Sequence, residues 1–143
     1  MNLKEVNKYN AETKEKWGNT SEYKEYEEKS KNRTKQKAED INDRFMNIFS
    51  EIGKLKDVSV EDEKVQEKIK ELQQFISDNY YTCTNEILYS LGQMYVNDER
   101  FKENIDNAGG EGTAKFIYDA IAVYCSIWLI IKYRRRFLWV NMS

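Results

Sequence analysis

The sequence predicts an all-α fold of about five to six helices, and three observations carry that prediction. From residue 41 onward, apolar residues recur at the three- and four-residue spacing of helices. Proline is absent and only 6 of the 143 residues are glycine, so the turn residues that all-β folds need are missing. No segment shows the alternating pattern of a strand. The length suits one domain with a single core.

The first predicted helix, at about residues 20–36, is the weakest of the set. Asn19 is its predicted N-cap, and Glu22 stands three residues later in a capping-box pattern. Residues 8–39 contain no Leu, Ile, Val, Phe or Met. A segment so poor in aliphatic side chains cannot bury enough surface to offset the entropy it loses on ordering.

The aromatic residues Trp17, Tyr23 and Tyr26 nevertheless lie in the middle of that polar segment. They must dock on the rest of the chain, dock on a ligand, or stay exposed. The segment around Trp17–Tyr26 is therefore predicted to be an N-terminal arm that takes its stability from contacts outside itself.

Two longer helices follow, each marked by an apolar stripe. The second of them begins after a capping-box-like pair, Ser59 and Asp62. The stripe of the first helix consists of Ile41, Phe45, Ile48, Phe49, Ile52 and Leu55, and that of the second of Val65, Ile69, Leu72, Ile76 and Tyr80. Both stripes predict amphipathic helices that face a helical core.

Three shorter helices complete the predicted fold. Thr84 is a good N-cap for the first, and Asn97 for the second, which carries two acidic residues where the helix dipole favours them. The glycine-rich run 107–112 predicts an interhelical turn, and the last helix begins near Thr113. The predicted inward-facing residues are Ile87, Leu88, Leu91, Met94, Tyr95, Phe101, Ile105, Phe116, Ile117, Ala120, Ile121 and Tyr124.

Charge is distributed unevenly along the chain. The formal net charge is −2, so no global field favours nucleic acid or anionic lipid. Residues 126–143 carry basic but no acidic residues, whereas residues 1–125 hold 19 basic and 25 acidic side chains. The sequence thus describes an acidic domain followed by a basic, apolar tail.

Residue types that several chemistries require are missing. Histidine is absent and Cys83 lies 42 residues from Cys125, so we predict neither a zinc site nor a histidine-activated nucleophile. No phosphate-binding loop, nucleotide-binding glycine fingerprint or metal motif occurs, and no cofactor is predicted. The first 16 residues show no secretory signal pattern, so a reducing, cytoplasmic location is expected.

The run 79–84 places two tyrosines and a cysteine at a helix-to-helix turn. In one interpretation Tyr80 packs in the core and Cys83 is an inert buried thiol. In the other, Tyr80 and Tyr81 rim a concave site, and Cys83 lies near a helix N-terminus that favours its thiolate. Ten tyrosines suit the binding of bulky planar ligands. Further adaptable surface comes from Tyr89, Met94 and Tyr95.

Three collinear blocks of sequence resemble the TipAS antibiotic-recognition domain. The first block is Trp17-Gly18-Asn19-Thr20 with Glu22-Tyr23 and Ser30-x-x-Arg33-Thr34. The second is Tyr81-Thr82-Cys83-Thr84-x-Glu86 and the run from Leu91 to Phe101. The third is Asn104-Ile105-Asp106 and the Gly-Glu-Gly turn before Ala114-Lys115-Phe116. Such ordered blocks, spanning roughly residues 15–125, are more specific than any one of them.

The resemblance implies a globin-like helical domain that binds thiopeptide-type or other large antibiotics without catalysis. In that family the domain usually follows a MerR-type DNA-binding domain, and ligand capture is linked to ordering of the N-terminal segment. The chain is therefore expected to be the effector domain of a transcription activator or a free sequestering protein. With 143 residues it has no room for the DNA-binding module, so direct nucleic-acid binding is not expected.

The predicted cleft lies between the arm, the helices carrying Ile41–Leu55 and Ile87–Tyr95, and the turn at Tyr80–Cys83. Aromatic faces are expected to stack on the ligand, while amide and carboxylate side chains anchor it. The predicted ligand-binding residues are Trp17, Tyr23, Tyr26, Phe45, Asn79, Tyr80, Tyr81, Cys83, Tyr89, Met94, Tyr95, Asn104 and Asp106. Some family members capture a dehydroalanine-containing ligand through a cysteine, and Cys83 is the candidate here by default.

The predicted domain organisation has three parts: a charged leader at 1–16 that is a linker remnant, the antibiotic-binding domain at 17–125, and the tail at 126–143. The tail is interpreted as a helix extension or as non-native residues, with a membrane-surface anchor as the other interpretation. Its apolar stretch is too short to span a bilayer, and it would promote self-association. Two alternative functions remain at this stage: a helical protein-interaction module that uses the tail, and an enzyme that depends on Cys83.

Overall fold

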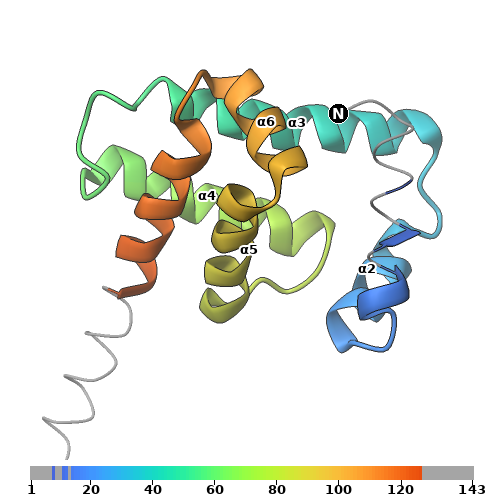
Figure 1. Cartoon of the computed structure of the whole chain (residues 1–143). Coiled ribbons are helices and arrows are strands. Elements are labelled where there is room, and N and C mark those ends of the chain that lie inside the picture. The colour runs from blue at the N-terminus through green and yellow to red at the C-terminus, as the bar shows by residue number, and fades with distance from the viewer. Residues whose placement is uncertain (1–7, 9–10, 13, 127–143) are drawn as a thin grey trace, which may run out of the picture.

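The computed structural model describes residues 8, 11–12 and 14–126 (Figure 1). Every secondary-structure element within these residues is a helix, which confirms the all-α prediction. Helical residues at 8, 11–12 and 14–17 come first. They are followed by α2 (Ser21–Ser30), α3 (Lys35–Gly53), α4 (Glu63–Asn79), α5 (Asn85–Asn97) and α6 (Glu99–Gly109), and by a last helix described over residues 113–126. The predicted tail beyond residue 126 and most of the predicted leader lie outside the described residues.

One hydrophobic core joins α3, α4, α5, α6 and the last helix. Helices α3 and α6 cross closely because glycines meet at the crossing. A Cβ atom added to Gly53 would lie 2.4 Å from the carbonyl oxygen of Gly109. The core residues with no exposed surface include Ile52, Val65, Ile69, Leu72, Leu88, Ala114, Ile117, Ala120 and Ile121.

The arm, described over residues 14–33, lies beside this core (Figure 1). Its helix α2 contains no buried residue, in contrast to α3 and α4. Within the described residues, α2 contacts the core mainly at the C-terminal part of α4. The arm is therefore attached at the edge of the fold and is not enclosed in it.

The boundaries of α2 differ from the predicted ones. Thr20, not Asn19, is the N-cap, and its hydroxyl oxygen accepts from the N–H of Tyr23 at 3.2 Å. The predicted helix 20–36 is wrong at its other end, because α2 ends at Ser30 and a second cap follows. Thr34 has an extended backbone there and starts α3. The N-cap residue Thr34 thus divides a segment that the sequence pattern had predicted to form a single helix.

Two further caps also shift. Asp62, not Ser59, caps α4, and Asp98, not Asn97, caps α6. In both cases the aspartate closer to the helix accepts from a backbone N–H of the first turn. The residue predicted as the cap therefore remains in the segment that precedes the helix. The predicted Thr84 cap is confirmed, since its hydroxyl accepts from the first turn of α5 at 3.2 Å.

The glycine-rich turn before the last helix is confirmed as an interhelical connection. Gly110 and Gly112 have φ angles of 97° and 88°, which side chains with a Cβ rarely adopt. The last helix then starts at Thr113, whose hydroxyl donates to the carbonyl of Gly110 at 2.6 Å. Among the described residues, none of the helices is long and apolar enough to cross a membrane.

Candidate ligand-binding site

A series of aromatic rings connects the arm to the core. In α2, the ring centroids of Tyr23 and Tyr26 lie 6.0 Å apart. Tyr26 stacks on Tyr80 at the end of α4, with centroids 5.9 Å apart and 22° between the planes. Tyr80 in turn meets Phe45 of α3 edge to face at 5.6 Å. Tyr26 therefore docks on the rest of the chain, the first of the three possibilities raised by the sequence, and Tyr23 packs against Tyr26 within α2.

The same series of rings continues into the interior. Phe45 contacts Phe49 at 4.8 Å, and Phe49 contacts Tyr95 of α5 at 5.4 Å, both edge to face. Tyr95 is 1% exposed, and Tyr95 also contacts Phe101 at 6.1 Å. Tyr95 is therefore a core residue that supports the site from behind, while the half-buried Phe45 lies between core and arm.

Burial of the ring series affects its hydroxyl groups. Desolvation raises the pKa of Tyr80 to about 12 and also raises that of Tyr26. Both phenols stay neutral at physiological pH and can donate a hydrogen bond. The stack thus offers flat apolar faces with neutral polar tips, which suits planar ligands rich in heteroatoms.

Polar contacts join the arm to the turn between α4 and α5. The carboxylate of Glu25 accepts from the N–H of Thr82 at 2.8 Å and from its hydroxyl at 2.7 Å. Lys29 donates to the carbonyl of Ser77, and Arg33 donates to that of Asn79. Sequence reasoning missed Glu25, Lys29 and Thr82 as arm contacts, and the only available signal was the four-residue spacing of the charges.

A second contact holds the beginning of the described N-terminal region. Arg100, in the first turn of α6, forms an ion pair with Glu12 at 2.9 Å and another with Asp98 at 3.0 Å. Hydrogen bonds from Arg100 lower the pKa of Asp98.

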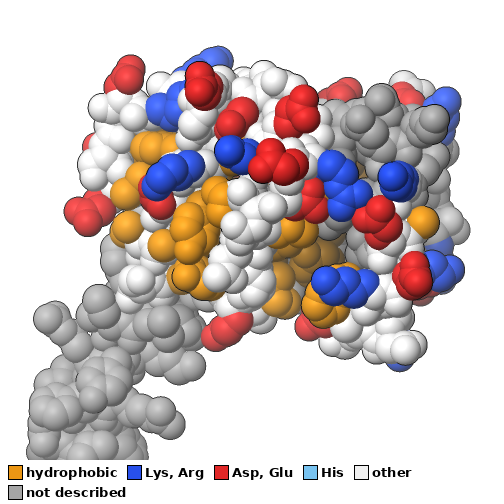
Figure 2. All heavy atoms as spheres, in the orientation of Figure 1, with side chains coloured by type: hydrophobic (Ala, Val, Ile, Leu, Met, Phe, Trp, Pro, Cys, Tyr) orange, Lys and Arg blue, Asp and Glu red, His pale blue; other side chains and the backbone are white. Residues whose placement is uncertain are grey.

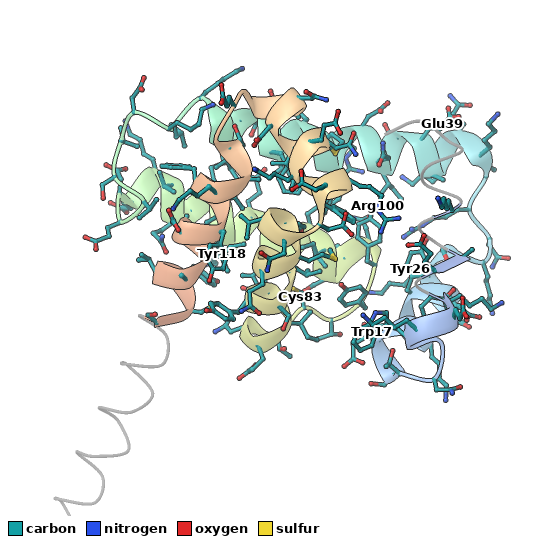
Figure 3. All side chains as sticks on the ribbon, viewed as in Figure 1. Trp17, Tyr26, Glu39, Cys83, Arg100 and Tyr118 are labelled. Carbon is teal, nitrogen blue, oxygen red and sulfur yellow. The ribbon has the colours of Figure 1, made fainter. Side chains whose placement is uncertain are left out.

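Figure 3 shows Arg100 on the side of the core that faces Trp17 and Tyr26. Figure 2 shows hydrophobic side chains on the floor of the hollow between the core and the arm.

Trp17 is the most exposed large hydrophobic residue on the arm, at 51%. The ammonium group of Lys16 lies 5.3 Å from the centre of its ring. Tyr81 and Met94 are half-buried and pack against the core. Of the predicted site residues, Trp17 on the arm is thus exposed to solvent, and Tyr81 and Met94 on the core are partly exposed.

Three predicted polar anchors are engaged with the backbone. Asn79 donates to the carbonyl of Phe75 at 3.0 Å, and Asn104 donates to that of Arg100 at 2.6 Å. Asp106 accepts from the N–H of Ala114 at 2.9 Å and so caps the last helix. Asn79 lies where the arm docks, whereas the other two stabilise α6 and the last helix locally. Their predicted ligand contacts stay predictions.

Of the two interpretations of Cys83, its surroundings favour the buried thiol over the thiolate. Its side chain is 5% exposed, and burial raises its pKa to about 12. The thiol donates weakly to the carbonyl of Thr84 at 3.8 Å. Desolvation therefore outweighs the nearby helix N-terminus, and the interpretation of an inert buried thiol fits its surroundings.

Tyr89 is separated from the arm. It is 37% exposed on α5, and its hydroxyl lies 3.3 Å from that of Tyr118 on the last helix. The last helix and the arm lie on opposite sides of α5 in the view of Figure 3. Tyr89 is therefore not brought together with the predicted residues of the arm.

A second hollow, of about 470 Å³, lies between α3 and α4. Apolar side chains, Ile48 and Phe75, form part of its lining, and the guanidinium of Arg44 lies 5.3 Å from the centre of the Phe75 ring. The remaining lining residues are Glu67, Lys70, Glu71, Gln74 and Asp78. Five of the eight lining residues are charged and Phe75 is the one aromatic ring among them, which makes this hollow a poorer match for bulky aromatic ligands than the ring series.

An all-helical core with an aromatic arm docked on it has the features of a helical ligand-recognition domain. The described residues contain no cluster of side chains able to hold a metal ion. The sequence model of the TipAS antibiotic-recognition domain matches residues 9–124. The chain belongs to this family.

Individual relatives agree with the family assignment. The transcriptional activator TipA of Streptomyces coelicolor is 36% identical over 115 residues, covering 79% of this chain and 45% of TipA. The transcriptional activator Mta of Bacillus subtilis is 35% identical over 81 residues, covering 57% of this chain and 31% of Mta. The chain thus matches less than half of the length of these relatives.

A solved structure is also similar, that of nosiheptide in complex with TipAS, from a thiopeptide antibiotic multidrug resistance system of Streptomyces lividans. The TM-score is 0.68 at 32% sequence identity, and the match covers 84% of this chain and 85% of the other. This likeness confirms the predicted globin-like helical fold class.

Proposed function

We propose that this chain binds bulky antibiotics of the thiopeptide type without chemically converting them. The observation that carries the proposal is membership of the TipAS family, together with 32% identity to a domain solved with nosiheptide. Because the curated relatives are transcriptional activators, the chain serves as the effector domain of a MerR-type activator or as a free sequestering protein. DNA contact then belongs to a separate MerR-type domain.

The ligand lies against the aromatic face shared by arm and core. Trp17 supplies exposed aromatic surface, and the stack of Tyr26 on Tyr80 supplies a rigid wall. Tyr81 and Met94 add adaptable surface beside it. Aromatic surface of this kind gives large contact area at low entropic cost, and that favours flat heterocyclic ligands.

The arm orders more fully when ligand binds. Helix α2 has no buried residue, so a ligand that covers its aromatic side chains adds the burial that it lacks. Part of the binding free energy is used for this ordering. The antibiotic-binding domain on this proposal comprises residues 17–125 of a cytoplasmic protein, with residues 1–16 as a linker remnant.

A titration with nosiheptide tests the proposal. Helicity by far-UV circular dichroism and the melting temperature are both expected to rise, because the ligand binds only the folded state. In Trp17→Ala the affinity falls, whereas in Tyr89→Ala, the matched control on the far side of α5, it does not. An unchanged melting temperature at saturating nosiheptide would contradict the proposal for this ligand class.

A further inference from the structure

The turn between α4 and α5, residues 80–84, carries two residues of the proposed ligand surface, Tyr80 and Tyr81. A turn lacks the repeating backbone hydrogen bonds of a helix, so its buried N–H and C=O groups need other partners. At Cys83 two side chains of α4 supply them. The hydroxyl of Ser77 accepts from the N–H of Cys83 at 3.0 Å, and the side-chain amide of Gln73 donates to its carbonyl at 3.0 Å. Both backbone groups of Cys83 are thus held by α4.

The side chain of Gln73 contacts three separate parts of the fold. Besides the carbonyl of Cys83, its amide nitrogen donates to the side-chain oxygen of Asn85 in the first turn of α5 at 2.8 Å. Its amide oxygen accepts from the hydroxyl of Tyr124 in the last helix at 2.7 Å. A glutamine amide offers two N–H donors and an acceptor oxygen, and here both kinds of group are used. An ionised glutamate in its place could keep only the contact with Tyr124, because it has no donor.

The last helix reaches this region through two neighbouring residues. Burial raises the pKa of Tyr124, so the phenol stays neutral and keeps the proton that it donates to Gln73. The thiol of Cys125 donates weakly to the carbonyl of Asn85 at 3.4 Å. The start of α5 and the turn before it therefore rest on α4 and on the last helix together.

All of these hydrogen bonds join residues of the core, so they do not require an ordered arm. The last helix and the arm lie on opposite sides of α5 (Figure 3). The last helix can therefore influence the ligand surface through the turn, without being part of that surface.

We propose that Gln73 and Tyr124 are positioning residues for the antibiotic: they fix the α4–α5 turn from the core side and so hold Tyr80 and Tyr81 in the conformation that the ligand meets. This inference rests on the proposed function, whereas the hydrogen-bond network itself does not. A preformed surface does not have to be ordered when the ligand binds. Loosening the turn therefore weakens the affinity without removing any ligand contact.

Amide hydrogen exchange of the full chain without ligand tests the network. Tyr124→Phe removes the hydroxyl that holds Gln73, so exchange of the Cys83 amide is expected to rise about threefold to tenfold, the range for one hydrogen bond. Tyr118→Phe is the matched control, because it removes a hydroxyl from the same helix that pairs with Tyr89 instead. Equal exchange of the Cys83 amide in the two variants would overturn the network.

Nosiheptide binding to the same variants tests the positioning role. The Kd is expected to rise about threefold to tenfold in Tyr124→Phe and to stay unchanged in Tyr118→Phe. Ile117→Val is the control for stability, because it trims a buried side chain of the last helix and lowers the melting temperature without touching the turn. A Kd that rises as much in Ile117→Val as in Tyr124→Phe would overturn the positioning role. So would an unchanged Kd in Tyr124→Phe.

A double-mutant cycle tests whether the two residues act as one unit. Gln73→Met removes all three contacts of the amide at similar side-chain length, so it should raise the Kd more than Tyr124→Phe does. Adding Tyr124→Phe to Gln73→Met is expected to change the Kd by less than about twofold, because the hydroxyl of Tyr124 has already lost its acceptor. Effects that multiply in the double variant would overturn the shared network.

Failure of the positioning role can be told apart from failure of the proposed function. If nosiheptide does not bind the unmodified chain, the proposed function fails for this ligand class, and the positioning role fails with it. Exchange of the Cys83 amide still decides whether Gln73 and Tyr124 fix the turn. If nosiheptide binds the unmodified chain and all variants equally, only the positioning role is overturned.

Discussion

The arm and the core consist of similar helices but are held by different forces. The core buries aliphatic side chains completely, as at Ile69 and Leu72. The arm helix buries none of its residues and is joined through a stack of half-buried rings and exposed charged groups. Burial of aliphatic surface is worth more than exposed polar contacts. The core therefore sets global stability, and the arm is a weaker element whose opening is local.

Removing a core side chain should have the largest effect. Ile69→Ala deletes buried carbon atoms in α4, so the free energy of unfolding should fall by about 2–5 kcal/mol. Chemical denaturation measures it. Val58→Ala is the control, because Val58 is 39% exposed, and we expect a change within about 0.5 kcal/mol. Equal losses in the two variants would show that the core is not the stabilising region.

Disturbing the crossing of α3 and α6 should cost somewhat less. In Gly53→Ala the new Cβ meets the backbone of Gly109 at 2.4 Å, so the helices must separate, at about 1–3 kcal/mol of unfolding free energy. Gly92→Ala is the matched control in a buried helical position, where the Cβ meets only side-chain atoms, at 3.3 Å. A thermal melt in which Gly92→Ala is the less stable variant would contradict the close backbone crossing.

A substitution in the arm should unfold the arm helix with little effect on the stability of the core. Tyr26→Ala removes the stack on Tyr80, so most of the helical signal of the ten-residue α2 should be lost. The free energy of unfolding of the core should fall by no more than about 1 kcal/mol, the scale of one aromatic pair. Circular dichroism together with denaturant unfolding measures both. A loss as large as that of Ile69→Ala would mean that arm and core form one cooperative unit.

Lowering the pH should weaken the docking of the arm on the core, and this is the smallest of the predicted effects. The pKa of Glu25 is lowered from 4.5 in the folded state, so its contribution is present above the unfolded value and is lost as pH falls through the folded value. The carboxylate is partly exposed, and screening by solvent keeps the effect small. The amide resonance of Thr82 followed by NMR from pH 6 to pH 3 should report this titration. In Glu25→Gln the same resonance should show no such step.

Much of the fold could be predicted because helical periodicity is a strong signal. The stripes of Ile41–Leu55 and Val65–Tyr80 predicted α3 and α4, and Thr84 marked the start of α5. The caps at Asn19, Ser59 and Asn97 were wrong. Neighbouring polar residues compete for the same first-turn N–H, and backbone geometry rather than residue type decides between them.

The site was harder to predict, because its contacts connect distant parts of the chain. The aromatic residues in the polar N-terminal segment indicated that the arm needs a surface to dock on. Nothing in the sequence, however, paired Glu25 with Thr82, which is 57 residues away. Nor could the sequence decide between a buried and an accessible Cys83, since burial depends on how α5 packs. Asp106 was chosen as a ligand anchor from its polar character, whereas the structure uses it to cap the last helix.

Amide chemical-shift mapping during a nosiheptide titration tests most directly the claim that the arm is the ligand-responsive region. We expect the largest shifts in residues 14–33 and in the turn at residues 79–82, with smaller ones along the arm-facing side of α5. Shifts confined to the hollow between α3 and α4, or to the Tyr89–Tyr118 pair, would contradict it.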